Sequence, residues 1–291
     1  MNEVSQKIER IRSIFLDTQL FYTNNNETDA LIGYLEKIEI LYRSIGYESA
    51  SMSIALKDLE NNRRLDNWLF FAKGPALAHK AQVYIGLGWA IAKLNLPFTE
   101  IVQMIESRLY HRVADGCGYY DGNFRQRHTV INMQAPVYLP EAAMPIYDQG
   151  VGRSLWYSSN ADIEKIRSKI EHFPARRHAD LWRGVGIAVA YVGGCDEETL
   201  KTLLEYAGIN RVQLACGSAL AAKSRMEANS MTADTDRCSR LWFSLTESET
   251  NMFSLDTGNP DTIGNEKAYM NWVMQIEEGL ANSFEITLAK F

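Results

Sequence analysis

The stretch ADLWRGVGIAVAYVGG, residues 179–194, decides the fold because it sets Gly184 and Gly186 inside a long apolar run. Its apolar residues recur at helical spacing, and the final Gly-Gly pair is typical of a helix end. Glycine inside a helix costs about 1 kcal/mol relative to alanine, so its use there indicates that a second helix approaches closely. The stretch therefore predicts a helix packed tightly against its neighbours.

The same small-residue signature recurs along the chain. It reads Gly86-Leu87-Gly88, Gly116-Cys117-Gly118, Gly150-Val151-Gly152, Gly184-Val185-Gly186 and a degenerate Ala215-Cys216-Gly217. The steps between the first small residues are 30, 34, 34 and 31 residues. A period of this size is typical of helical-hairpin repeats, in which each hairpin buries its apolar face by stacking on the next. The segment 47–52, YESASM, is interpreted as a degenerate first copy.

We therefore predict an all-α helical-hairpin repeat array of about five helix pairs, folded as one domain over residues 1–291. The first helices of the pairs are expected over residues 76–94, 111–124, 141–158, 177–192 and 209–228. The second helices are expected over residues 98–109, 160–171, 195–206 and 232–246. An N-terminal segment (1–46) with helices at 3–16 and 28–45, the repeats (47–247) and a C-terminal cap (248–291) with a helix at 265–285 complete the expected order.

Residues 125–145 depart from this pattern. Pro136, Pro140 and Pro145 stand where a second helix belongs, and proline within a helix removes a hydrogen bond and clashes with the preceding turn. The segment is therefore expected to be irregular. It is either a packing loop or an insertion that covers a functional face, and the sequence leaves both alternatives open.

Composition excludes several classes of function. The 291 residues are 46% hydrophobic with a net charge of −6, so no basic surface is offered to nucleic acid. The four cysteines lack metal-ligand spacing, and the Gly-x-Gly pairs lie within helices without a preceding strand, so neither a metal nor a cofactor is expected. With no membrane-spanning apolar run and no signal-peptide pattern, the sequence predicts a cytoplasmic protein.

Polar side chains precede the glycines on successive first helices, and equivalent positions of a stacked array line one concave surface. Convergence there would raise the pKa values of the carboxyl groups and suit them to general-acid work. In the alternative interpretation they accept hydrogen bonds from helix N-termini and set the stacking. The candidate catalytic residues are Asp115, Asp121, Asp148, Asp180 and His178, and the candidate ligand-binding residues are Trp89, Tyr119, Tyr120, Tyr147 and Arg183.

Six segments together resemble one known family. They are YESASM (47–52), AHKAQVYIGLGWAIAKL (78–94), ADGCGYYDGNF (114–124), YDQGVGRSLWY (147–157), RRHADLWRGVGIAVAYVGG (176–194) and LACGSALAAKSR (214–225). They are similar to the domain-of-unknown-function family that includes the UnbL-type proteins of enediyne biosynthesis clusters. The resemblance implies an association with polyketide-type pathways that build unsaturated carbon skeletons, without a defined reaction. This chain has Tyr120-Asp121 where members of that family carry His-Glu.

A weaker resemblance is to tetratricopeptide repeats. In residues 179–198, Trp182, Gly186 and Gly193 fall near the tryptophan, glycine and turn positions of that repeat. The likeness supports a helical-hairpin architecture and implies no ligand.

Three functional hypotheses follow. The first is an accessory protein of a polyketide or lipid-like pathway that binds an apolar or unsaturated intermediate, or a partner enzyme, in a concave groove. The second is a cofactor-free cyclase, isomerase or hydratase that uses groove aspartates as general acids, and the third is a protein-interaction scaffold. A deep pocket with buried carboxylates favours the enzyme, whereas an open polar face favours the scaffold. Trp272, Val273 and Met274 on the C-terminal helix also suggest a homodimer.

Overall fold

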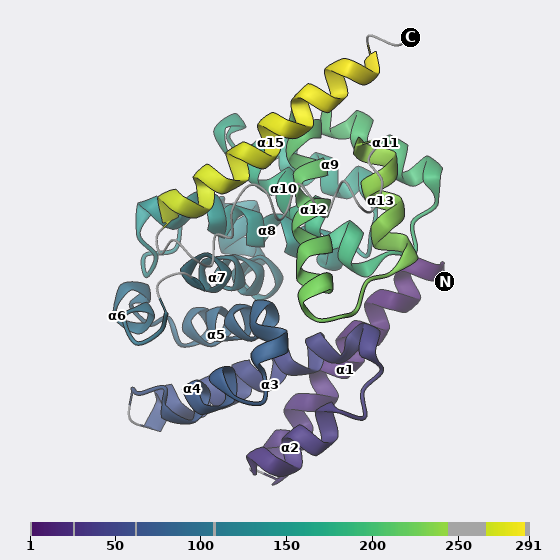
Figure 1. Ribbon diagram of the computed structural model, residues 1–291. Coiled ribbons are helices and arrows are strands. Elements are labelled where there is room, and N and C mark those ends of the chain that lie inside the picture. Colours follow the sequence, from purple (N-terminus) through teal and green to yellow (C-terminus); the bar gives the residue numbers. More distant parts are fainter. Residues whose placement is uncertain (1, 26, 62, 107–108, 244–265, 289–291) are drawn as a thin grey trace.

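The computed structural model describes residues 2–25, 27–61, 63–106, 109–243 and 266–288, and the regular structure in these ranges is helical (Figure 1). The all-α prediction is confirmed. The α-helices are α1 (Glu3–Asn25), α2 (Thr28–Leu35), α3 (Ile40–Asn61), α4 (Asp66–Lys73), α5 (Lys80–Leu94), α6 (Phe98–Val102), α7 (Tyr110–Phe124), α8 (Met144–Ser158), α9 (Ile163–His172), α10 (Ala175–Val192), α11 (Glu197–Ala207), α12 (Arg211–Glu227), α13 (Ala233–Phe243) and α15 (Glu266–Leu288).

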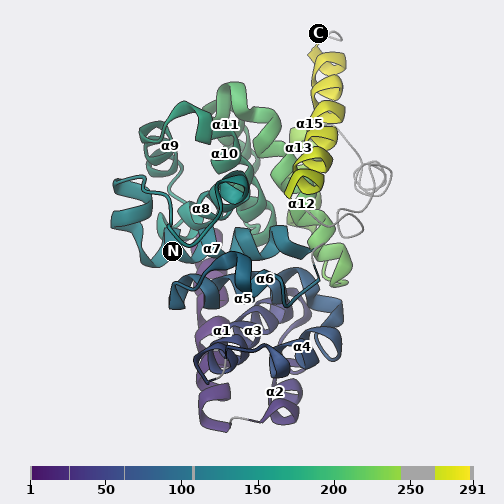
Figure 2. The same cartoon turned by 90° about the vertical axis from the view of Figure 1, so that its left-hand side faces the viewer.

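Helices α3, α5, α7, α8, α10 and α12 pack side by side in chain order and form an inner layer (Figure 1). Helices α4, α9, α11 and α13 pack against members of this layer. Helix α1 crosses α3 and reaches α10, while α15 lies along α12, α13 and α7, as Figure 2 shows from the side. The layer is curled, and its two ends are in contact. Arg225 of α12, the last inner helix, donates a hydrogen bond to the carbonyl of Leu41 in α3, the first, at 3.3 Å.

The Gly-x-Gly signatures set the spacing of the inner layer. A Cβ at Gly150 would lie 1.9 Å from the carbonyl oxygen of Asp115 in α7, and a Cβ at Gly152 would lie 2.0 Å from that of Leu181 in α10. The first glycine thus touches the backbone of the preceding helix and the second touches the backbone of the next. Since no side chain fits between these helices, the residue type at both positions is fixed by contact.

The same contacts correct the expected register at α12. Gly186 meets the carbonyl of Leu214, and Gly217 meets that of Arg183 at 2.1 Å from its added Cβ. These are the contacts that the first and second glycines make elsewhere, so the α12 signature is Gly217-Ser218-Ala219, which begins 33 residues after Gly184. The expected Ala215-Cys216-Gly217 was placed two residues too early.

The N-terminal helices differ from the expected ranges. Helix α1 was predicted to end at residue 16 but continues to Asn25, because Thr18 and Tyr22 prolong its buried face. Gly46 was predicted to end a helix but lies inside α3, where an added Cβ would meet Ile38 at 2.6 Å. Gly46 therefore serves close packing, not termination.

Pro145 stands in the first turn of α8, where proline is tolerated, so helix already resumes within the expected segment. Residues 125–143 are irregular, as expected from Pro136 and Pro140. They contain a single π-helical turn, η3 (Arg127–Ile131), and a 3-10 turn, η4 (Glu141–Ala143). Tyr138 is buried, and its carbonyl accepts a hydrogen bond from the Phe98 amide at 3.0 Å. Tyr138 also donates a hydrogen bond to Asp121 in α7 at 2.7 Å. These contacts favour the packing-loop interpretation.

The C-terminal helix buries two of the three residues on which the homodimer prediction depends. Trp272 and Val273 are 5% and 0% exposed, whereas Met274 is 47% exposed. The homodimer stays a prediction, and the exposed apolar surface that supports it is much smaller than expected. Residues 244–265, which hold the expected end of the 232–246 helix and the start of the C-terminal cap, lie outside the described residues. No helix in the described ranges is long and apolar enough to cross a membrane.

Two glycine substitutions test the role of the backbone contacts. Gly150→Ala should destabilise the protein by at least about 3 kcal/mol, because its Cβ would collide with a backbone oxygen that cannot move independently. Gly33→Ala in α2 is the matched control, since nothing lies within 4 Å of its added Cβ. The control should stabilise the protein by up to about 1 kcal/mol through helix propensity. Urea unfolding measures both, and equal effects would contradict the contact argument.

Candidate functional site

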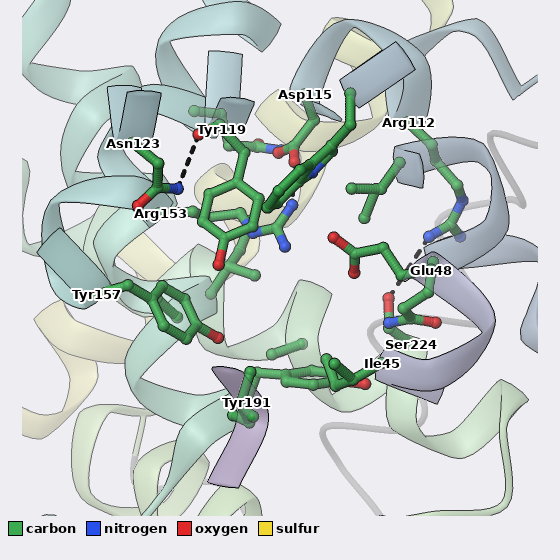
Figure 3. Close-up of a pocket in the computed structure, with 18 of the residues that line it drawn as sticks. Ile45, Glu48, Arg112, Asp115, Tyr119, Asn123, Arg153, Tyr157, Tyr191 and Ser224 are labelled. Carbon is green, nitrogen blue, oxygen red and sulfur yellow. Dashed lines mark hydrogen bonds and ion pairs between the residues drawn. The ribbon is translucent and has the colours of Figure 1, made fainter. Parts of the chain in front are cut away.

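A cavity of about 480 Å³ lies inside the curl of the inner layer (Figure 3). Every inner helix contributes to its wall, and α1 and α15 contribute residues that include Phe15 and Trp272. This volume falls within the range of small-molecule sites, which is roughly 300–1,000 Å³. The site is therefore a chamber between helices and not a shallow groove.

The cavity wall follows directly from the Gly-x-Gly signature. The residues immediately before and after the signature are four positions apart, so they share one helix face, while the middle residue points to the opposite face. The middle residues Leu87, Cys117, Val151 and Val185 are fully buried on that opposite face. The flanking residues that line the cavity are Glu48, Ile85, Asp115 and Gln149 before the signature, and Trp89, Tyr119, Arg153, Ile187 and Leu220 after it.

A buried ion pair lies on one wall of the cavity. Asp115 in α7 pairs with Arg153 in α8 and accepts a hydrogen bond from Gln149 Nε2 at 2.8 Å. Tyr269 of α15 donates to Gln149 Oε1 at 3.0 Å, which ties the C-terminal helix to the pair. The Arg153 guanidinium also lies 4.6 Å from the centre of the Tyr119 ring, a cation–π contact visible in Figure 3. Asp115 is thus fully engaged.

Glu48 stands apart from this network. Its side chain points from α3 toward the middle of the cavity (Figure 3) and is 2% exposed. Among the described residues, no hydrogen bond or ion pair joins its carboxylate to another side chain. Burial raises the pKa of Glu48 from 4.5 to about 7; the positive charge of Arg153 opposes this rise and the negative charge of Asp115 adds to it. A carboxyl group with this pKa exchanges its proton near neutral pH.

Aromatic side chains make up much of the remaining wall. Trp89 packs edge-on against Tyr119, with ring centres 5.0 Å apart, and Tyr119 meets Tyr157 at 5.4 Å. Two turns before Tyr119 on the same helix, the ring of His111 stacks on Tyr269 of α15, with ring centres 4.3 Å apart. Such rings offer large apolar surfaces whose faces attract positive charge.

Several buried polar atoms at the cavity have no hydrogen-bond partner within the described part of the chain. Among them are Trp89 Nε1, Trp272 Nε1, Gln82 Oε1, Ser158 Oγ and Arg112 Nε. A buried polar group without a partner costs about 1–3 kcal/mol. Their concentration around one chamber is what a site for a ligand with a few polar atoms requires.

Three of the predicted site residues line the cavity. These are Asp115, Tyr119 and Trp89, which flank the signature directly. The other seven lie elsewhere, so the expected convergence of Asp115, Asp148 and Asp180 in one groove is wrong. The reason is angular: Asp148 falls two residues before Gly150 and not one, which turns its side chain about 100° away from that of Gln149.

Asp148 and Asp180 have partners outside the cavity. Asp148 accepts two hydrogen bonds from Arg177, of 2.8 and 2.5 Å, and Arg177 also donates to the carbonyl of Met133. Burial raises the pKa of Asp148 to about 6, although Arg177 opposes the rise. Asp180 pairs with Arg183 at 2.6 Å, and Arg183 is held in turn by Glu277 of α15. Asp148 thus joins α8 to α10 and Arg183 joins α10 to α15, whereas Asp180 pairs within α10. The partners of both aspartates are arginine side chains, and not the helix N-termini that the stacking interpretation expected.

The remaining candidates also have structural contacts. Asp121 accepts hydrogen bonds from Arg125, Tyr138 and Tyr147, which fixes the irregular segment onto α7. His178 contacts the carbonyl of Phe173 through Nε2 at 2.7 Å. Tyr120 is half-buried, and the guanidinium of Arg125 lies 5.6 Å from the centre of its ring.

Sequence reasoning missed Glu48, the cavity residue best suited to proton transfer. Glu48 was quoted in YESASM, but its signature, Ser49-Ala50-Ser51, contains no glycine and therefore hid the register. A strict rule would have found it, because Glu48, Asp115 and Gln149 each immediately precede the first small residue. Arg153 follows from the same rule on the other flank. In the ranges that the structure describes, no three metal-ligating side chains gather, and the four cysteines are free and buried.

Glu48→Gln tests whether this carboxyl is destabilised by burial. Its raised pKa means that the folded state keeps a proton that the unfolded state loses between about pH 4.5 and pH 7, so stability falls as pH rises through this window. The full penalty is about 3 kcal/mol above pH 8. The free energy of unfolding of the variant, measured with urea, should therefore equal that of wild type near pH 4. At pH 8 it should be higher by about 3 kcal/mol. A pH-independent difference would contradict the assignment; Glu60→Gln, exposed on the same helix, is the control.

Asp148→Asn tests a structural role against a catalytic one. The change leaves the buried Arg177 without its counter-charge, so the free energy of unfolding should drop by about 3 kcal/mol. Asp180→Asn should cost less, since Arg183 keeps Glu277. Thermal melts measure both. Loss of ligand binding with an unchanged melting temperature would instead show that Asp148 belongs to the functional site.

Comparison with known proteins places the chain in a family. No match was found among curated proteins or among solved structures. Residues 1–280 match the family described as "Protein of unknown function (DUF1702)", which covers the inner layer, the cavity wall and most of α15. The chain therefore belongs to this family of proteins of unknown function.

Proposed function

We propose that the protein binds a predominantly apolar small molecule in the central cavity. The observation that carries this proposal is the chamber itself, of about 480 Å³, with aromatic and aliphatic walls and a few polar groups without partners. Ligand sites in proteins combine an apolar lining with a small number of polar groups that fix orientation. Flat aromatic walls suit an extended or unsaturated carbon skeleton.

A binding role is favoured over a pure interaction scaffold. Scaffolds of stacked helices present an open concave surface to a partner, whereas here Arg225 joins the two ends of the layer and α1 and α15 add to the wall. Polar and charged residues of the wall, Glu48, Asp115 and Gln149 among them, are almost completely buried. These groups are accessible to a small molecule and not to a folded partner.

We further propose that the chain is a helical-repeat protein related in architecture to tetratricopeptide arrays. Support comes from the equivalent backbone contacts that Gly116, Gly150, Gly184 and Gly217 make with the preceding helix. The resemblance to proteins of enediyne clusters supports a role as a cytoplasmic accessory protein of a polyketide-type or lipid-like pathway. The ligand would then be an unsaturated biosynthetic intermediate.

A second candidate function is a cofactor-free isomerase or cyclase, and the isolation of Glu48 favours it. The protonated carboxyl would transfer its proton to a carbon–carbon double bond, leaving a carboxylate beside the resulting carbocation. Loss of a proton from a neighbouring carbon back to Glu48 would give an isomerised or cyclised product and restore the acid. Glu48 replaces the aspartates first considered for this role, because Asp148, Asp180 and Asp115 are engaged in ion pairs.

Filling the cavity tests the binding proposal. Ala188 in α10 is 1% exposed and lines the chamber, so Ala188→Leu should fill part of it. The neutral apolar dye N-phenyl-1-naphthylamine should bind the wild type with enhanced fluorescence, and its affinity should fall at least about tenfold in the variant.

The control is Ala175→Leu, an exposed position at the start of the same helix. It adds the same side chain outside the chamber and should leave dye binding unchanged. Equal affinity of the dye for wild type and Ala188→Leu would place the dye elsewhere and remove the support for a ligand-binding cavity. Circular dichroism establishes that each variant keeps its helical fold.

A further inference from the structure

Glu48 has no direct basic partner among the described residues of the cavity wall. The charged and titratable wall residues are Arg12 on α1, His111, Arg112, Asp115 and Tyr119 on α7, Arg153 and Tyr157 on α8, Tyr191 on α10, Lys223 on α12 and Tyr269 on α15. Arg112 and Lys223 both pair with Glu227, and Arg12 pairs with Glu9. Arg153 pairs with Asp115. Each cation of the wall thus contacts an acid other than Glu48, with Arg112 and Lys223 sharing Glu227, and no ion pair of the described wall includes Glu48.

An ionised carboxylate in this position needs a positive charge beside it. Arg153 and Asp115 are the charged groups whose fields act on Glu48, and they act in opposite directions because they form an ion pair. Burying an unpaired charge is strongly unfavourable, and proteins avoid it by holding a proton or by binding a counter-ion. A proton on Glu48 would remove this cost, and a cationic ligand would remove it by supplying the missing charge.

The aromatic wall supplies the second requirement of a cation site. A cation within about 6 Å of an aromatic ring centre is attracted to its face, most strongly when water is excluded. Arg153 already makes this contact with Tyr119 at 4.6 Å inside the cavity. Trp89, Tyr157 and Trp272 provide further rings in the same wall.

An additional acceptor lies on the neighbouring helix. Gln82 of α5 is 4% exposed, lines the chamber, and its Oε1 has no donor among the described residues. Helix α5 packs directly on α3, which carries Glu48. A protonated amine carries several N–H donors, so one such group can serve both a carboxylate and an amide oxygen.

We infer that the cavity takes a ligand with one protonated amine on an apolar skeleton, and that Glu48 is the counter-ion of this amine. The inference rests on the proposed function, namely that the chamber binds an apolar small molecule. It adds the chemical class of the polar group and the residue that recognises it.

The inference predicts a proton-linked affinity. An ammonium ligand binds the ionised form of Glu48, so binding displaces a proton from this carboxyl group wherever it is protonated. With a pKa of about 7, the ionised fraction falls about tenfold between pH 8 and pH 6, and the apparent affinity should fall with it. A neutral ligand of the same length displaces no proton and should show no such loss.

Three probes of equal chain length test the inference: octylammonium, 1-octanol and octanoate. Isothermal titration calorimetry at pH 8 and pH 6 should give octylammonium about tenfold tighter binding than 1-octanol at pH 8. This preference should shrink at pH 6 and disappear in Glu48→Gln. Glu60→Gln removes an exposed acid from the same helix and should keep the preference.

The outcomes separate the inference from the proposed function. If 1-octanol binds wild type as tightly as octylammonium at both pH values, Glu48 acts as a neutral hydrogen-bonding acid and the inference is overturned, while the cavity still binds apolar molecules. Tightest binding of octanoate would overturn it in favour of Arg112 or Arg153 as the recognition group. If none of the probes binds, the proposed function fails and the inference fails with it. The pH dependence of wild type keeps the test valid even if Glu48→Gln does not fold.

Discussion

Direct contact between helix backbones is the constraint on which this structure depends. A Cβ at Gly118, Gly150 or Gly184 would lie 1.9 Å from a carbonyl oxygen of the adjacent helix, so neighbours meet without intervening side chains. Contact of this kind fixes both the distance and the register of each helix against the next. Because the contact repeats along the inner layer, neighbouring helices from α5 to α12 keep the same register. Residues at equivalent positions of the signature therefore lie side by side along the curved layer.

The cavity is a geometric consequence of this register. One glycine of each signature faces the preceding helix and the other faces the next. The flanking residues therefore share the face toward the cavity, and the middle residue lies on the opposite face of the helix. The middle positions, such as Val151 and Val185, are apolar and buried. The flanking positions are free to vary in chemistry, which is how Glu48, Asp115 and Arg153 come to stand in the same wall. Architecture and site thus arise from one signature.

Electrostatics distinguishes the groups that hold the fold from the group available to a ligand. Asp148, Asp180 and Asp121 each have basic or hydroxyl partners that join helices or fix the irregular segment. Asp115 is neutralised by Arg153 within the wall itself. Glu48 is buried without a partner in the described structure, and burial moves its pKa close to neutral. Ionisable groups with shifted pKa values cluster at functional sites, which is the basis for proposing Glu48 as the group that meets a ligand.

The sequence by itself determined the all-helical class, five of the six inner helices (α5, α7, α8, α10 and α12) and the irregularity of residues 125–143, because glycine spacing, apolar periodicity and proline act through local geometry. It placed α10 to within a few residues but missed the continuation of α1, the interior position of Gly46 and the α12 register, each of which depends on contacts between helices. Only the tertiary structure decided which acids share a cavity: a shift of one residue turns a side chain about 100°, enough to send Asp148 to Arg177 and to leave Glu48 unpaired.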